Sequence, residues 1–213
     1  MKRVSLLFAF TLLVIFLSSC LRTIHPIFTV NDIVYEPKLI GNWLTEKDGK
    51  KEGQVSIINL ATANSVELPG NIGTIKNKGY LVSYKDDNGN ITEQYIAFLA
   101  SIGKHLYFDY YPVETESEKK LDDFFLAHYI KVHTSYRVNI FPNGSFELNQ
   151  LDENYLTKLI NEKKVRVRHE KDDDGSITII NASTEELQQY LIKYGDDPGA
   201  YRSDKTKFFK TSL

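Results

Sequence analysis

The order of apolar and polar residues divides the chain into an apolar run near its start and a longer region of short alternating segments. From Val4 to Leu17 every residue except Ser5 and Thr11 is apolar. A helix needs about 20 apolar residues to cross a bilayer, so this run is too short to span one. After residue 33, short runs with β character alternate with polar turns. The pattern predicts a β-rich domain behind an apolar leader.

Turn residues between these runs predict antiparallel hairpins. The segment Asp86-Asp87-Asn88-Gly89-Asn90 contains an Asn-Gly pair, which suits the positive φ angles of a tight hairpin turn. Pro142-Asn143-Gly144 offers Pro and Gly at the positions that a second turn requires. The expected strands are 54–60, 79–84, 91–99, 106–111, 125–133, 136–141, a return strand through Phe146 and Leu148, 164–170, 176–181 and an edge strand over 201–209.

Three segments have helical spacing of apolar residues and suitable first residues. Ser183 and Glu186 form a capping box ahead of an apolar stripe that ends at Tyr194. Asp152 is the expected N-cap of a helix that runs to about Lys163, and a third helix is expected over 115–124. Together with the strands, these segments predict an α+β domain that is mainly antiparallel β, with two or three packed helices.

The start of the chain has the features of an export signal. Lys2 and Arg3 precede the apolar run, as in a signal peptide. The run ends in Leu17-Ser18-Ser19-Cys20, which resembles the lipobox of bacterial lipoproteins. The resemblance implies cleavage between Ser19 and Cys20 and a diacylglyceryl and an acyl lipid on Cys20. An ordinary signal peptide and an uncleaved anchor helix are the alternatives, but Cys20 is the only cysteine of the chain and would otherwise be an unpaired thiol.

This reading divides the chain into a signal peptide at 1–19, a lipidated extended tether at 20–32 and a single β-rich domain at 33–213. The full chain has 26 Lys and Arg against 28 Asp and Glu, and the leader removes two of the basic residues, so the mature chain has a net charge of 24 − 28 = −4. Such a mildly acidic surface of mixed sign does not have the basic patch of a nucleic-acid-binding protein. We therefore expect no nucleic-acid partner.

Two resemblances refine the fold. Gly41-Asn42-Trp43 resembles the G-x-W motif that opens the first strand of lipocalins, where the Trp closes the bottom of the barrel. Segments 29–43, 128–132 and 181–191 resemble a group of uncharacterised lipoproteins from Bacteroidetes. The chain departs from that group at Tyr155 and Asn181, where the group has Trp and Thr. The resemblance implies a lipocalin-like sheet or partial barrel in the cell envelope, and it implies no activity.

Known catalytic and metal-binding motifs are missing from the sequence. His128 and His133 are five residues apart, which would place them on opposite faces of one strand. The acidic turns at 86–90 and 172–176 lack the Gly and Glu that a calcium loop requires. The chain also lacks the nucleophile elbow, the phosphate-binding loop and the dinucleotide fingerprint. We expect no catalytic residue, no metal and no cofactor beyond the lipid on Cys20. An enzyme whose residues meet only in the folded state is the third hypothesis.

The remaining hypotheses concern binding. In the run from Tyr107 to Tyr111, alternation places Tyr107, Asp109 and Tyr111 on one face of a strand and Phe108 and Tyr110 on the other. The side chains that are candidates for ligand or core contacts are Trp43, Tyr107 and Tyr111.

Two functions stay open on this basis. The first is a membrane-anchored envelope lipoprotein, without enzymatic activity, that binds an apolar small ligand or a partner protein. The alternative is a structural, interaction or toxin-protection lipoprotein without a ligand pocket. The residues Leu21-Arg22-Thr23 lack the Asp that retains some lipoproteins in the inner membrane and the acidic cluster of surface-exported ones. The resemblance to lipoproteins thus implies the outer membrane, facing the periplasm.

Overall fold

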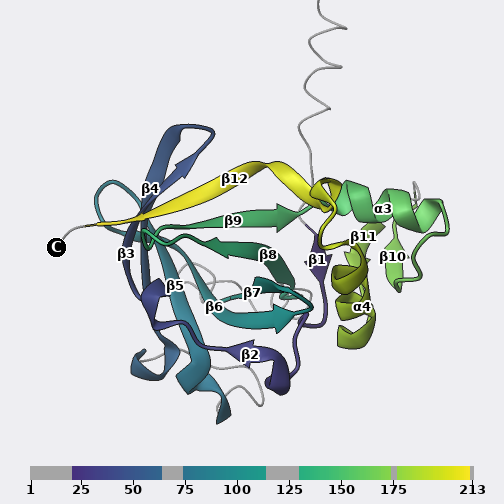
Figure 1. Cartoon of the computed structure of the whole chain (residues 1–213), viewed down its shortest axis with the longest axis horizontal. Coiled ribbons are helices and arrows are strands. Elements are labelled where there is room, and N and C mark those ends of the chain that lie inside the picture. Colours follow the sequence, from purple (N-terminus) through teal and green to yellow (C-terminus); the bar gives the residue numbers. More distant parts are fainter. Residues whose placement is uncertain (1–20, 64–73, 114–129, 174–176, 212–213) are drawn as a thin grey trace, which may run out of the picture.

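A computed structural model describes residues 21–63, 74–113, 130–173 and 177–211 of the chain. Within this part, eight antiparallel strands form a closed barrel, because β9 pairs with β12 on one side and with β8 on the other (Figure 1). In barrel order the strands are β3 (Gly41–Lys47), β4 (Lys50–Asn59), β5 (Gly79–Lys85), β6 (Ile91–Ile102), β7 (His105–Pro112), β8 (His133–Ile140), β9 (Phe146–Leu151) and β12 (Tyr201–Lys210). The expected class, mainly antiparallel β with packed helices, is confirmed, and the expected lipocalin-like sheet or partial barrel is a closed barrel.

The last strand, β12, has a more central place than its sequence predicts. It pairs with β3 from Thr206 to Lys210 and with β9 from Tyr201 to Phe208. The prediction of an edge strand over 201–209 is therefore wrong. The polar residues of β12 are exposed or partly exposed while Phe208 is fully buried inside the barrel, so a strand that closes the barrel resembles an edge strand in sequence.

Short pieces of chain extend the sheet beyond the barrel. Strand β1 (Arg22–Thr23) pairs with β8 and, in parallel, with β11 (Ile177–Ile180), which pairs in turn with β10 (His169–Lys171). Strand β2 (Ile33–Val34) pairs with the end of β6, beyond the end of β5. Of the strand expected at 164–170, only the last residues are β. Among the described residues, the 3-10 helices are η1 (Val30–Asp32), η2 (Pro37–Leu39), η3 (Leu60–Thr62), η5 (Lys76–Lys78) and η7 (Pro198–Ala200).

Two α-helices lie with β10 and β11 on one side of the barrel (Figure 1). Helix α3 (Glu153–Asn161) begins after Asp152, whose carboxylate accepts hydrogen bonds from two backbone N–H groups of the first turn. Helix α4 (Thr184–Tyr194) has the expected capping box, because Glu186 N–H donates to Ser183 Oγ and Ser183 N–H donates to the Glu186 carboxylate. Both predicted helix starts are confirmed. The helix expected at 115–124 lies outside the described residues.

The two predicted hairpin turns are also confirmed. Asp86 Oδ1 accepts hydrogen bonds from the backbone N–H groups of Asn88 and Asn90, at 2.9 and 2.8 Å. Gly89 has a φ of 84° and Gly144 a φ of 83°, the left-handed conformation that favours glycine. These turns fix the register of β5 against β6 and of β8 against β9.

The domain contains two large cores, one inside the barrel and one outside it. The buried members of the inner core are Leu39, Trp43, Val55, Ile57, Tyr80, Val82, Ala97, Leu99, Phe108, Tyr110, Val138, Phe146, Leu148 and Phe208. The outer core lies between the barrel wall and the helices and includes Leu21, Ile27, Ala100, Ile102, Tyr107, Leu151, Leu156, Leu159, Leu187, Tyr190 and Leu191. A smaller third cluster includes Ile33 of β2.

The segment from Leu21 to Asp32, expected as part of a tether, lies against the barrel wall. Leu21 is 3% exposed and Ile27 is 1% exposed. The buried carboxylate of Asp109 holds this segment, since its Oδ2 accepts a hydrogen bond from Ile27 N–H at 3.0 Å. His133 Nδ1 also hydrogen-bonds to Asp109. Residues 1–20, which contain the predicted signal peptide and Cys20, lie outside the described residues. In the part that the structure describes, no helix is long and apolar enough to cross a membrane.

Candidate functional site

One part of the barrel interior is filled by aromatic side chains. The Trp43 indole N–H donates to the backbone oxygen of Leu39 at 3.1 Å. The Trp43 ring meets Phe146 edge-on, with centroids 4.8 Å apart, and Phe146 stacks on Phe208 at 4.3 Å. All three rings are at most 1% exposed. This packing leaves no room for a ligand around Trp43, which lies on β3, the first strand of the barrel.

The other part of the barrel contains a hollow. It lies where β3 and β5 end, and its volume is about 410 Å³. Four tyrosines from four different strands contribute to its lining: Tyr84, Tyr95, Tyr110 and Tyr136. Polar side chains at the strand ends complete it, among them Thr45, Lys47, Glu52, Gln54, Thr92 and Glu93. This hollow is the candidate functional site.

The tyrosine rings pack on one another around Tyr110. The centroid of the Tyr110 ring is 5.4 Å from that of Tyr95 and 5.1 Å from that of Tyr136. Tyr84 meets Tyr95 edge-on at 6.0 Å. Burial raises the pKa of Tyr110 and of Tyr84 well above the ordinary value of a tyrosine. These hydroxyls are therefore protonated at neutral pH, and they can donate or accept hydrogen bonds but do not act as bases.

The Tyr110 hydroxyl is the unusual group of this cluster. Tyr110 is 2% exposed, and its hydroxyl has no hydrogen-bond partner in the structure. The Tyr84 hydroxyl is its polar neighbour, and their interaction lowers the pKa of Tyr110 and raises that of Tyr84. The two hydroxyls do not meet the geometry of a hydrogen bond, so this interaction leaves the Tyr110 hydroxyl without a full partner. By contrast, the Tyr95 hydroxyl donates to Glu93 at 2.6 Å. A buried polar group without a partner costs about 1–3 kcal/mol, and a ligand that pairs with Tyr110 would recover this energy.

Charged side chains lie at the edge of the hollow. Lys47 Nζ is 2.8 Å from the Asp204 carboxylate, which also accepts hydrogen bonds from Arg202. Burial alone would raise the pKa of Asp204, but the hydrogen bonds from Arg202 and Lys47 lower it to about 2. The hydrogen bond to Asp204 raises the pKa of Lys47. The edge of the hollow thus has a fixed cation at Lys47, held by an ionised carboxylate.

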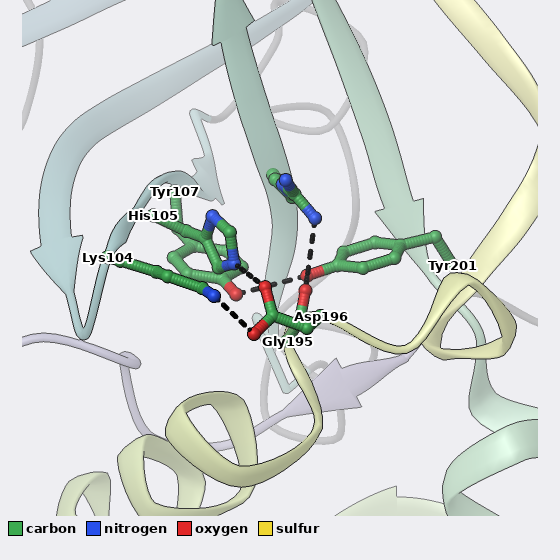
Figure 2. A network of polar contacts seen from close by, with 7 residues as sticks. Lys104, His105, Tyr107, Gly195, Asp196 and Tyr201 are labelled. Atoms are coloured by element: carbon green, nitrogen blue, oxygen red, sulfur yellow. Dashed lines mark hydrogen bonds and ion pairs between the residues drawn. The ribbon is translucent and has the colours of Figure 1, made fainter.

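A second polar network lies on the outer wall of the barrel, where β7 and β8 meet the chain after α4 (Figure 2). The backbone oxygen of Gly195 accepts hydrogen bonds from Arg137 Nη1 at 3.0 Å and from the Tyr201 hydroxyl at 2.9 Å. The Tyr201 hydroxyl is also 3.0 Å from the Tyr107 hydroxyl. These contacts attach the end of α4 to the barrel wall.

Next to this network, Asp196 is bound by two basic side chains of the β6–β7 turn region (Figure 2). Lys104 Nζ lies 2.6 Å from Asp196 Oδ2, and His105 Nε2 lies 2.8 Å from Oδ1. The hydrogen bonds from Lys104 and His105 lower the pKa of Asp196. The carboxylate of Asp196 is therefore ionised and already engaged.

The structure does not bring the sequence candidates together. Trp43 lies in the filled part of the barrel, and Tyr107 is fully buried in the outer core. Tyr111 is half-buried on the outer wall, with its ring 4.9 Å from that of His133. Residues 107–111 alternate between the two sides of the wall, as expected, but it is Tyr110, on the inward side, that lines the hollow. Sequence reasoning missed it because an inward tyrosine without a partner has the same pattern as a core tyrosine.

Among the described residues, no three His, Cys, Asp or Glu side chains are placed to hold a metal ion together. His128 lies outside these residues. Comparison of the chain with protein-family models, with curated proteins and with solved structures gave no match.

Proposed function

We propose that the protein is a non-enzymatic, lipid-anchored lipoprotein of the cell envelope whose barrel binds a small molecule in the tyrosine-lined hollow. The observation that carries the proposal is the buried Tyr110 hydroxyl without a partner at the edge of a hollow of about 410 Å³. Native proteins pair almost all buried polar groups, so an exception at the edge of a hollow requires an explanation, and a bound ligand supplies one. The barrel fold adds support, since a barrel of about eight strands can hold one small ligand.

The lining defines the chemistry of this ligand. Ring faces of Tyr84, Tyr95 and Tyr136 suit a flat, largely apolar body, because aromatic rings favour stacked or edge-on contacts. A polar atom on this body would pair with the Tyr110 hydroxyl. A polar end of the ligand would lie at the edge of the hollow, beside the Lys47–Asp204 ion pair. The proposed ligand is therefore a small amphipathic molecule rather than a long acyl chain, for which the filled half of the barrel has no space.

The anchor in this proposal is Cys20, with diacylglyceryl and acyl lipid after cleavage behind Ser19. Stable attachment requires two or more chains, since one acyl chain binds a membrane only marginally. The proposed location is the outer membrane, facing the periplasm. Replacing Cys20 by Ser tests this part: the variant should lose its lipid mass and leave the detergent phase for the aqueous phase. A Cys20→Ser protein that partitions like the wild type would refute the anchor.

Ligand extraction tests the hollow. The full-length chain would be purified in detergent from its native membrane and its bound small molecules identified by mass spectrometry. We expect one amphipathic compound, whose affinity Tyr110→Phe weakens about tenfold through the loss of one buried hydrogen bond. Tyr80→Phe is the matched control, because Tyr80 lies inside the same barrel and does not line the hollow.

Two outcomes would refute ligand binding. The first is a protein that carries no compound and binds none from an envelope extract. The second is an affinity that Tyr110→Phe leaves unchanged. A stable partner protein that co-purifies in place of a ligand would favour the alternative function, a structural or interaction lipoprotein without a pocket.

A further inference from the structure

The outer wall of the barrel contains a cleft that the proposed function does not use. Its volume is about 490 Å³, and its lining includes Arg137, Asn139, Asn149, Tyr201 and Lys205. We propose that this cleft binds an oxyanion, the carboxylate or phosphate group of a small molecule, and that Arg137 is the residue that holds it. This site is separate from the tyrosine-lined hollow and shares no lining residue with it.

The sheet places Arg137 in the middle of a row of outward residues. Arg137 of β8 is directly opposite Tyr107 of β7 on one side and Asn149 of β9 on the other. Asn149 is in turn opposite Lys205 of β12. Side chains of directly opposed residues lie about 4.5–5.5 Å apart at Cβ, so the row brings a guanidinium, an amide and an ammonium to one surface.

The charge of Arg137 has no counterpart in the described residues. No carboxylate forms an ion pair with it there. Asp196 lines the same cleft, but Lys104 and His105 bind it. Glu147 accepts hydrogen bonds from Asn139 and from Lys205, at 2.8 and 3.4 Å. A half-buried guanidinium without an anion is unfavourable, and an oxyanion in the cleft would compensate it.

The Arg137 side chain is held in one orientation. Its Nη1 donates to the Gly195 oxygen at 3.0 Å, and its guanidinium lies 5.5 Å from the centre of the Tyr201 ring. Its Nε is buried and has no hydrogen-bond partner. The guanidinium also interacts with the Tyr201 hydroxyl, but Nε, which forms one edge of the guanidinium together with Nη2, lacks a hydrogen-bond partner among the described residues. Such an edge matches a carboxylate or a phosphate group with two parallel hydrogen bonds.

The test follows the Nε–H signal of Arg137 by ¹H–¹⁵N NMR on the full-length chain in detergent. Inorganic phosphate, succinate and short-chain phosphatidylglycerol are titrated in separate arms, which distinguish a free anion from a lipid headgroup. We expect a saturable shift of this signal with at least one of them. In Arg137→Lys this signal is absent, so the affinity is followed on the backbone N–H signal of Asn149 in this variant and in the wild type. It should fall about tenfold, because the lysine cannot make the two parallel hydrogen bonds.

A second variant supplies the anion from the protein itself. Asn149→Asp places a carboxylate opposite Arg137, so the Nε–H signal should already lie near its ligand-bound position and the added anions should no longer bind. Asn149 also donates to Glu147 at 3.4 Å, so the new carboxylate lies beside a second one, and circular dichroism first checks that this variant keeps the fold. Arg166→Gln, on a distant exposed segment, is the control and should bind as the wild type does.

The proposal is overturned if none of the three anions shifts the signal saturably. It is also overturned if Asn149→Asp binds them as the wild type does. Tyr110→Phe should leave anion binding unchanged, which keeps this result independent of the barrel ligand.

Discussion

The two halves of the barrel interior are built by the same strands but have different contents. In the filled half, Trp43, Phe146 and Phe208 pack ring against ring, and the polar atom of Trp43 has a backbone partner. In the other half, tyrosines surround a hollow, and the Tyr110 hydroxyl has no partner. Both halves follow the same inward–outward alternation. The difference lies in whether each inward polar atom finds a partner within the protein.

This comparison separates residues that stabilise the barrel from residues that are available to bind. An interior that is filled and whose polar atoms are all paired has neither the space nor the free hydrogen-bonding groups to bind a ligand. An interior with an unpaired hydroxyl is less stable than it could be, and such local inconsistencies are expected at functional sites. The contrast therefore predicts that substitutions in the two halves will change the free energy of unfolding by different amounts. At one pair of tyrosines, the changes should have opposite signs.

The largest effect should come from the filled half. Trp43→Ala removes a fully buried ring and leaves a cavity, so we expect a loss of about 3–5 kcal/mol in the free energy of unfolding. Tyr95→Ala, at the half-buried edge of the hollow, should cost only about 1–2 kcal/mol, because less area is lost from the core. Urea unfolding followed by fluorescence or circular dichroism measures both. Equal losses would show that the two halves are packed alike.

A smaller effect concerns the ion pair at the edge of the hollow. The pKa of Asp204 is lowered from 3.8 to about 2, so its ionised form stabilises the fold. This contribution is present above pH 3.8 and is lost as the pH falls through about 2. We expect it to be about 1–2 kcal/mol after screening by solvent.

Asp204→Asn should remove this pH dependence. Thermal unfolding of the variant and the wild type between pH 5 and pH 2 should show curves that converge at the acid end. If the difference in stability between the two proteins stayed constant from pH 5 to pH 2, the ionised Asp204 would not contribute to stability.

The smallest expected change in stability comes from removing the hydroxyl of Tyr80 or of Tyr110, and it has opposite signs at the two residues. The Tyr80 hydroxyl accepts a hydrogen bond from Glu36 N–H at 2.6 Å, so Tyr80→Phe should lower stability by about 1 kcal/mol. Tyr110→Phe removes a buried hydroxyl that has no partner, and without ligand it should raise stability by about 0.5–1 kcal/mol. Differential scanning calorimetry on ligand-free protein compares them. A destabilised Tyr110→Phe would mean that its hydroxyl is paired in the free protein.

Local features of the fold were predictable from the sequence, because local hydrogen bonds cause them. The capping box of Ser183 and Glu186 needs only a hydroxyl and a carboxylate three residues apart. The turn at Asp86 needs only Asn and Gly at positions that tolerate a positive φ. Trp43, a candidate for ligand or core contacts from the sequence, lies in the inner core.

Long-range features were not predictable in the same way. The closure of the barrel depends on pairing β12 with β3, which lie more than 150 residues apart, and nothing within residues 201–210 encodes that partner. The segment at 164–168 has the sequence pattern of a strand, but the structure begins β10 only at His169. The site was missed for the same reason: whether Tyr110 or Arg137 has a partner depends on residues brought together only by the fold.

The burial of Leu21 determines how the domain would be presented at a membrane. One residue of chain reaches at most about 3.6 Å, and Leu21, directly after Cys20, is already packed into the outer core. If Cys20 carries the proposed acyl chains, no flexible linker separates the bilayer from the barrel. The domain would then lie on the lipid headgroups in one fixed orientation. The end at which the chain enters β1 would face the lipid.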